Sequence, residues 1–244
     1  EYSPIPFFSQ DLIERPTLSA IEKMSEEEIL KSVSDKTGLD DLQCVGNIDG
    51  TLPCCVLESG DTRVTATVRG GLVMTMKTYA VCANENIGRD EATEKAAEFL
   101  ASYGYDSMVP TYTIVQDNAI LINFAYKDGD YVCYPDLIKV RVSLSDGCVL
   151  DMDASGYFRN HKERTIPSEV KTMEECRACV PKSLTVISES RAVIPTYGKK
   201  EKPCFEYKCE NENGQHYIIY ADTQSGTQAD ILQLIEDENG ILAK

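Results

Sequence analysis

The chain has 244 residues, of which 42% are apolar and 26% are charged, and it contains no tryptophan. This composition is typical of a soluble globular protein, and no apolar run reaches the about 18 residues that a membrane-spanning helix needs. The 24 basic and 40 acidic residues give a formal net charge of −16, which argues against nucleic acid and anionic lipid as partners. We interpret the acidic surface as a solvated one that favours solubility, in preference to a docking site for a basic partner.

The first part of the chain predicts an extended lead-in, residues 1–23, followed by a helix over residues 25–36. Ser25 and Glu28 have the spacing of a capping box, and Gly38 is placed to end the helix. Turn residues then separate four predicted strands. These strands lie around residues 43–48, 54–57, 63–68 and 72–79.

The middle of the chain predicts a helix over residues 89–102, which Gly104 ends. Gly88 is a weaker cap in the slot of Ser25, with Glu91 as its partner. Three alternating or apolar stretches follow as strands. Their sequences are TYTIVQ, AILINFAY and IKVRVSLS.

The last part predicts a shorter helix over residues 173–179, which Pro181 ends and which Thr172 and Glu175 cap. Four strands are expected after it. Their sequences are LTVISESRAVIP, CFEYKCE, HYIIYAD and QADILQLIE.

The same order of features therefore recurs three times, which indicates an internal repeat. In each copy a helix and its strands end on a hairpin glycine, namely Gly71, Gly147 or Gly226. The pattern predicts the α+β class, with three tandem units that each pack a helix on a small antiparallel sheet. The expected boundaries are 1–23 for the lead-in and 24–86, 87–168 and 169–244 for the units. The second unit includes a polar connector, Gly156–Pro167.

Three stretches carry a resemblance to a known family. They are the connector GYFRNHKERTIP, the ending ILQLIEDENG and, more loosely, the lead-in YSPIPFFSQDLIERP. With the three helix starts, they extend over essentially the whole chain. The repeated unit resembles a PepSY domain, and the chain resembles the C-terminal part of the spore germination protein YpeB family.

The resemblance implies a non-catalytic protein that lies outside the cytoplasm, at the inner membrane of the spore. Proteins of this family carry an N-terminal membrane anchor and a helical region that this sequence lacks, so membrane contact is expected only through that missing part. They work beside SleB, a cortex-lytic transglycosylase, and PepSY domains are thought to bind or restrain partners. The expected partner is therefore a SleB-like cortex-lytic enzyme. The expected cofactor is none.

Apart from the resemblance, the sequence contains few residues that could perform catalysis. Only His161 and His216 could serve as a general base, and we interpret both as histidines of hydrogen-bonded surface loops. Asp151 and Asp153 fall on the same side of a strand, and we interpret them as a solvated face. The alternative functions are a cell-wall hydrolase and a peptidase-inhibitory module.

The ten cysteines follow no disulfide or zinc pattern, and we expect mostly free, buried thiols. Cys176 falls in the helix slot of Ile29 and Ala92, and Cys148 follows a hairpin glycine. Cys176 and Cys179 form a CxxC motif, whose nearest second pair is Cys204 and Cys209. That second pair should point to opposite faces of a strand, so a metal or redox module is the less favoured alternative.

The connector also offers a candidate partner-binding patch. Its residues are Tyr157, Phe158, Arg159, His161, Glu163 and Arg164. We favour the interpretation that the aromatic residues anchor the connector against its neighbours while the charged residues are hydrated.

Overall fold

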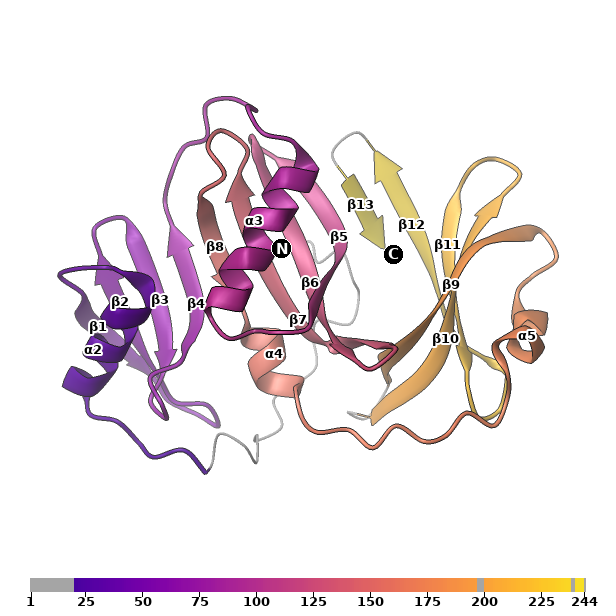
Figure 1. Cartoon of the computed structure of the whole chain (residues 1–244), viewed down its shortest axis with the longest axis horizontal. Helices are drawn as coiled ribbons and strands as arrows, with labels where there is room; N and C mark the ends of the chain where they lie inside the picture. The colour runs from indigo at the N-terminus through magenta and orange to yellow at the C-terminus, as the bar shows by residue number, and fades with distance from the viewer. Residues whose placement is uncertain (1–19, 197–199, 238–239, 244) are drawn as a thin grey trace.

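The computed structural model describes residues 20–196, 200–237 and 240–243. A few helices lie against one large, mostly antiparallel sheet (Figure 1), so the predicted α+β class is confirmed. No helix in these ranges is both long and apolar enough to cross a membrane. The predicted lead-in falls almost entirely outside the described residues.

The N-terminal segment begins with helix α2 (Glu26–Thr37). The predicted capping box is present, because the Ser25 amide donates to the Glu28 carboxylate at 2.7 Å and the Glu28 amide donates back to the Ser25 hydroxyl. Gly38 ends the helix in the left-handed region, at φ +70°. Four strands follow: β1 (Gln43–Ile48), β2 (Cys54–Ser59), β3 (Thr62–Thr67) and β4 (Val73–Thr78).

The middle segment begins with α3 (Arg89–Ser102), whose N-cap Gly88 makes no side-chain bond, as expected for the weaker cap. Its strands are β5 (Met108–Gln116), β6 (Ala119–Asp128), β7 (Tyr131–Ser143) and β8 (Val149–Asp153). The connector then forms a short helix, α4 (Ser155–Asn160), which the sequence analysis did not predict.

The C-terminal segment has the least helix. The predicted helix over 173–179 is divided into α5 (Met173–Cys176) and a turn of 3-10 helix, η2 (Arg177–Cys179), and the Thr172–Glu175 capping box is present. The strands are β9 (Leu184–Thr196), β10 (Lys200–Asn211), β11 (His216–Asp222), β12 (Gln228–Asp237) and β13 (Gly240–Ala243).

The strands join into one sheet of thirteen, whereas small separate sheets were expected. Strand β4 pairs with β8, so that Met76 lies opposite Met152, and β13 meets β5 at Gly240 and Ile114. A parallel pairing of β7 with β9 closes the eight strands from β7 to β9 into a ring. In three separate sheets these strands would be edges with unpaired backbone groups. The pairings provide hydrogen-bond partners for those groups. The division into three units stays a prediction.

The three hairpin glycines adopt the positive φ that their turns were predicted to need, at +56°, +78° and +72° for Gly71, Gly147 and Gly226. Each also lies against the helical region of its own segment. A Cβ at Gly71 would come within 3.1 Å of Ser32 on α2, and one at Gly147 within 2.5 Å of Lys95 on α3. A Cβ at Gly226 would lie 3.4 Å from Lys171, just before α5, and 3.7 Å from Cys176 on α5.

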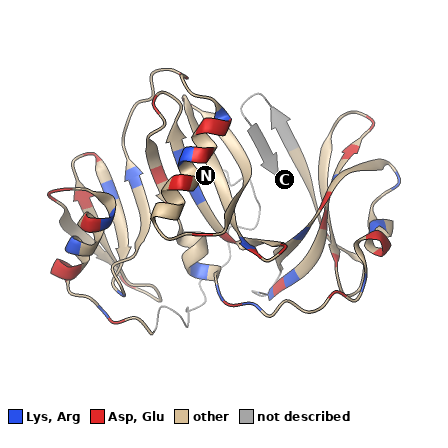
Figure 2. Cartoon of the chain, in the orientation of Figure 1, with Lys and Arg blue, Asp and Glu red and all other residues tan. Residues whose placement is uncertain are grey.

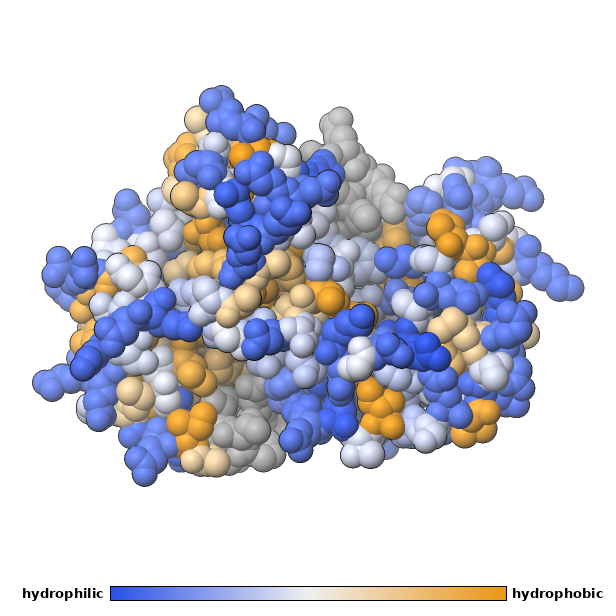
Figure 3. All heavy atoms as spheres, viewed as in Figure 1, coloured by the Kyte–Doolittle hydropathy of each residue, from blue (hydrophilic) through white to orange (hydrophobic). Residues whose placement is uncertain are grey.

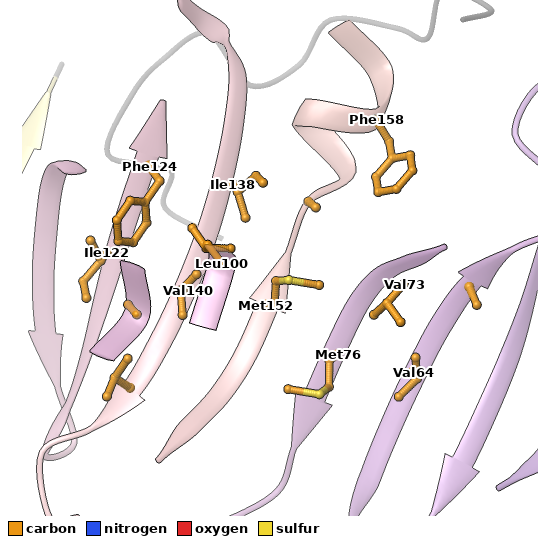
Figure 4. Close-up of a cluster of buried hydrophobic side chains, with 14 of the residues drawn as sticks. Val64, Val73, Met76, Leu100, Ile122, Phe124, Ile138, Val140, Met152 and Phe158 are labelled. Carbon is orange, nitrogen blue, oxygen red and sulfur yellow. The ribbon is translucent and has the colours of Figure 1, made fainter. Parts of the chain in front are cut away.

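One hydrophobic core extends across the N-terminal and middle segments. Figure 4 shows Met76 on β4 beside Met152 on β8, with Phe158 of α4 pointing towards Val73. A second cluster, which includes Tyr134, Ile194 and Tyr220, comes from strands of the ring, and a third packs Cys176 of α5 against β10 and β11. Because the first core is shared, neither of its two segments buries its apolar side chains alone.

Candidate functional site

The connector is attached to β8 through an acidic side chain. Asp153 accepts hydrogen bonds from the Ser155 amide at 2.9 Å and the Ser155 hydroxyl at 2.5 Å, at the start of α4. Asp151 pairs with Arg141 at 2.6 Å and is one-quarter exposed. The interpretation of Asp151 and Asp153 as a solvated face is therefore wrong, because both are half-buried and hold defined partners.

Helix α4 packs tightly on the sheet. A Cβ at Gly156 would lie 2.9 Å from the Leu137 carbonyl oxygen, so only glycine permits this approach of helix to strand. Phe158 is 4% exposed and belongs to the shared core. The ring of Tyr157 stacks on His161 at 4.2 Å between centroids and meets Tyr105 edge-on at 5.2 Å.

An ion-pair network ties the end of the connector to two strands. The Arg164 guanidinium donates to both carboxylate oxygens of Asp136 on β7, at 2.7 and 2.5 Å, and to both of Glu201 on β10, at 2.9 Å each. The Arg164 side chain is 4% exposed and Asp136 is fully buried. His161 Nδ1 lies 2.8 Å from the same Asp136 carboxylate.

The electrostatics of this network favour the charged form of Arg164. Burial alone would lower its pKa, but the hydrogen bonds and charges of Asp136 and Glu201 outweigh burial and raise the pKa. A fixed cation is thus held between two acidic side chains in a site with little solvent. Such a pair is costly to break because the remaining charge stays buried.

Of the six residues named for the candidate partner-binding patch, four lie in packed or ion-paired surroundings, and Arg159 is half-buried. Tyr157 and His161 stack, Phe158 lies in the core and Arg164 is in the ion-pair network. Glu163 is exposed. The anchoring of the connector agrees with the interpretation favoured from the sequence, and the partner-binding role stays a prediction.

A groove of about 500 Å³ opens beside α4, where the N-terminal and middle segments meet. Its lining includes three tyrosines from separate parts of the chain: Tyr103 and Tyr105 after α3, and Tyr157 on α4. The remaining lining residues are Ser32, Asp35, Lys36, Gly71, Leu72, Val73, Gly104 and Phe158. The groove could not be predicted from the sequence, because its walls lie far apart along the chain.

The two histidines have defined surroundings. His161 is held by Asp136 and stacked on Tyr157, and His216 Nε2 lies 4.0 Å from Glu210. These contacts agree with the interpretation of both histidines as parts of hydrogen-bonded structure. Figure 2 shows acidic and basic residues interspersed along the helices and strands, without one basic face.

All ten cysteines are free, and six of them are buried. Cys176 is fully buried in the helix slot that Ile29 and Ala92 also fill, as predicted. Cys148 is exposed, so the expected burial is wrong there, because the position after the hairpin glycine faces solvent. Within the described residues, no group of three or more His, Cys, Asp or Glu side chains is placed to hold a metal ion.

The CxxC motif and its candidate second pair are not assembled into one cluster. Cys204 packs in the cluster of the ring and Cys209 in the cluster beneath α5, on opposite sides of β10 as the strand alternation predicted. Burial raises the pKa of both the Cys54 and Cys209 thiols to about 11. A thiol with such a pKa is a weak nucleophile near neutral pH.

Comparison with protein families gives one match of defined extent. Residues 57–167 match the family model described as YpeB sporulation, PepSY1 and PepSY2 domains. The match runs from β2 to the end of the connector. It therefore covers β3, β4 and the complete middle segment with α4.

Curated relatives carry the name sporulation protein YpeB. The chain is 29% identical over 154 residues to the protein of Halalkalibacterium halodurans, covering 63% of this chain and 34% of the relative. It is 24% identical over 173 residues to that of Oceanobacillus iheyensis, covering 71% of this chain and 38% of the relative. The chain thus spans little more than a third of the length of the curated relatives it matches.

A solved structure has the same fold. The C-terminal domain of Bacillus megaterium YpeB superposes with a TM-score of 0.75 at 21% identity, covering 88% of this chain and all of that chain. The family model, the relatives and the solved structure agree. The family model and the curated relatives confirm the resemblance to the YpeB family that the sequence indicated, and the solved structure shows that the fold is shared.

Proposed function

We propose that this chain, which is related to the YpeB sporulation family, is a non-catalytic region that binds a protein partner outside the cytoplasm. The proposed partner is a SleB-like cortex-lytic enzyme, which the chain would localise or stabilise. We further propose that the three segments are PepSY-like units with the boundaries 24–86, 87–168 and 169–244. The similar contacts of the three hairpin glycines with their helical regions support that division.

The groove beside α4 is the main support for this proposal. Its volume of about 500 Å³ is in the range of pockets that enclose a small ligand, so side chains of a partner would fit into it. Tyrosine is enriched at protein interfaces because it combines a large apolar area with a hydroxyl group, and three tyrosines line this groove. Tyr157 and Phe158 belong both to the groove lining and to the predicted connector patch.

The alternative functions have less support. A hydrolase would need two facing carboxylates or a metal, and the carboxylates of the buried Asp136 and the half-buried Glu201 are instead neutralised by Arg164. A zinc site would need Cys176 and Cys179 close to the second cysteine pair, which lies divided between two faces of β10. A redox module would need a reactive thiolate, and burial raises the pKa of both Cys176 and Cys179. A peptidase-inhibitory module remains compatible with a partner-binding groove.

The test replaces an exposed residue of the groove and measures binding of the cortex-lytic enzyme. Leu72, in the groove lining, is 39% exposed, so Leu72→Asp adds a charge there without opening the core. Val81→Asp is the matched control, because Val81 is 97% exposed and does not line the groove. We expect Leu72→Asp to weaken the complex by about tenfold or more. Equal binding by the two variants would place the contact elsewhere.

A further inference from the structure

In the part of the chain that the structure describes, the sheet ends in an open edge at strand β1, which has six residues. Within the described residues, β1 pairs only with β2, and it stands at the end of the sheet (Figure 1). Its sequence, QCVGNI, contains no charged residue and no proline. Those are the residues that natural sheets commonly place on edge strands to prevent pairing with other chains.

The opposite end of the sheet, strand β9, is paired over part of its length and carries a charged side chain. Strand β9 pairs with β7 in its second half, and in its first half Glu189 forms an ion pair with Arg177 of η2 at 3.2 Å. Strand β1 has one irregularity, a register shift between Cys44 and Gly46. After it, the backbone from Gly46 to Ile48 pairs regularly with β2, so this stretch keeps the geometry of an extendable edge.

Strand β1 exposes apolar side chains and has acidic residues on both sides. Val45 and Ile48 are 50% and 46% exposed, an apolar surface that a paired strand would cover. Asp40 and Asp41 precede the strand and Asp49 follows it, and all three are exposed. None of these three takes part in an ion pair with another described residue.

We propose that β1 is a docking edge that accepts an extended segment of another protein by strand addition, and that this segment carries Lys or Arg on both sides of an apolar stretch. Main-chain hydrogen bonds would supply affinity, and the acidic residues at the two ends would select the basic flanks. The charge pattern disfavours a second copy of this chain as the occupant. Antiparallel pairing of two β1 strands would bring Asp40 and Asp41 of one copy against Asp49 of the other.

This docking edge is separate from the groove beside α4, which β1 does not line. The inference therefore does not depend on the proposed function. A variant that loses binding in the groove should still bind at β1, and a variant that loses binding at β1 should still bind in the groove.

The probe is a synthetic peptide of alternating Val and Thr with two Lys residues at each end. Matched peptides carry Glu at the ends, or a proline in the centre, which removes a main-chain donor. Amide chemical shifts of the isotopically labelled chain report binding residue by residue at millimolar peptide. We expect the Lys-ended peptide to shift and protect the amides of residues 43–48, and the two matched peptides to bind more weakly by about tenfold or more.

Variants of the chain locate the effect. Val45→Lys places a positive charge on β1, which repels the Lys residues of the peptide. We expect this variant to lose the peptide-induced amide shifts at β1. Ile187→Lys is the control, because Ile187 is 57% exposed on β9, at the other end of the sheet. Three results would overturn the proposal: no shift at β1 with the Lys-ended peptide, equal binding of the Glu-ended peptide, or self-association of the chain through β1 without any peptide.

Discussion

Arg164 shows what a single residue contributes to this molecule. Its guanidinium joins Asp136 of β7 and Glu201 of β10 to the connector, so one side chain holds three parts of the chain together. The sequence placed Arg164 in a connector with mixed charge. It could not identify the two partners, because they lie 28 and 37 residues away and no local pattern links them.

Removing one partner of this network should be costly. In Asp136→Ala, Arg164 keeps its buried charge and loses two of its hydrogen bonds, so we expect the free energy of unfolding to fall by about 3–5 kcal/mol. Urea denaturation measures the change. Lys162→Ala is the control, since Lys162 is 46% exposed beside Glu201 and such surface pairs contribute about 1 kcal/mol or less. Similar losses in the two variants would show that the network does not stabilise the junction.

The ion pair between Glu169 and Arg191 makes the stability of the chain depend on pH in a defined direction. The hydrogen bond from Arg191 lowers the pKa of Glu169 below its ordinary value of 4.5, against the opposing effect of burial. A carboxylate with a lowered pKa in the folded state stabilises fully above pH 4.5, and its contribution is lost as the pH falls through the folded pKa.

The difference in unfolding free energy between the wild type and Glu169→Gln should therefore be constant from neutral pH to about pH 5 and shrink below it. Urea denaturation at a series of pH values measures the difference. A difference that grows on acidification would contradict the assigned direction of the shift.

At the scale of elements, the local signals in the sequence were informative. The capping boxes at Ser25 and Thr172 and the turns at the hairpin glycines formed as predicted, because they depend on neighbouring residues. The sheet was not predictable in the same way. The pairings of β4 with β8 and of β7 with β9 join strands that lie tens of residues apart, and alternation alone does not specify the neighbour of an edge strand.

The close approach of a hairpin glycine to its helix can be tested by comparison with a glycine that has no close neighbour. Gly71 and Gly38 both have positive φ, at +56° and +70°, so alanine is strained at either position by about 1–3 kcal/mol. At Gly71 the new Cβ would also lie 3.1 Å from Ser32, whereas at Gly38 nothing lies within 4 Å. We expect Gly71→Ala to lower the melting temperature more than Gly38→Ala. A greater effect at Gly38 would contradict the role assigned to the close approach.

In the whole molecule, the N-terminal and middle segments share one core, so we expect them to unfold together. Side chains from β3, β4, β7, β8 and α4 contribute to it (Figure 4). The surface shows hydrophobic residues in separate patches among hydrophilic ones on the face of Figure 3. The sequence predicted units in series and the structure shows continuous packing, because apolar side chains at the facing edges are buried only when the segments meet.

Phe158 tests this continuity, since it lies on the connector and is 4% exposed within the shared core. Phe158→Ala should destabilise the chain by about 3–5 kcal/mol. Amide hydrogen exchange should then show faster opening in β3 and in β7 together. Faster exchange in β7 alone would mean that the two segments open independently.

We propose that the chain binds a cortex-lytic enzyme and does not itself degrade the cell wall. Sedimentation velocity of the chain mixed with a purified SleB-like cortex-lytic enzyme measures the complex, and incubation of cortex peptidoglycan with the chain alone measures degradation. We expect a saturable complex and no release of peptidoglycan fragments by the chain alone. Absence of a complex, or release of fragments without the enzyme, would contradict it.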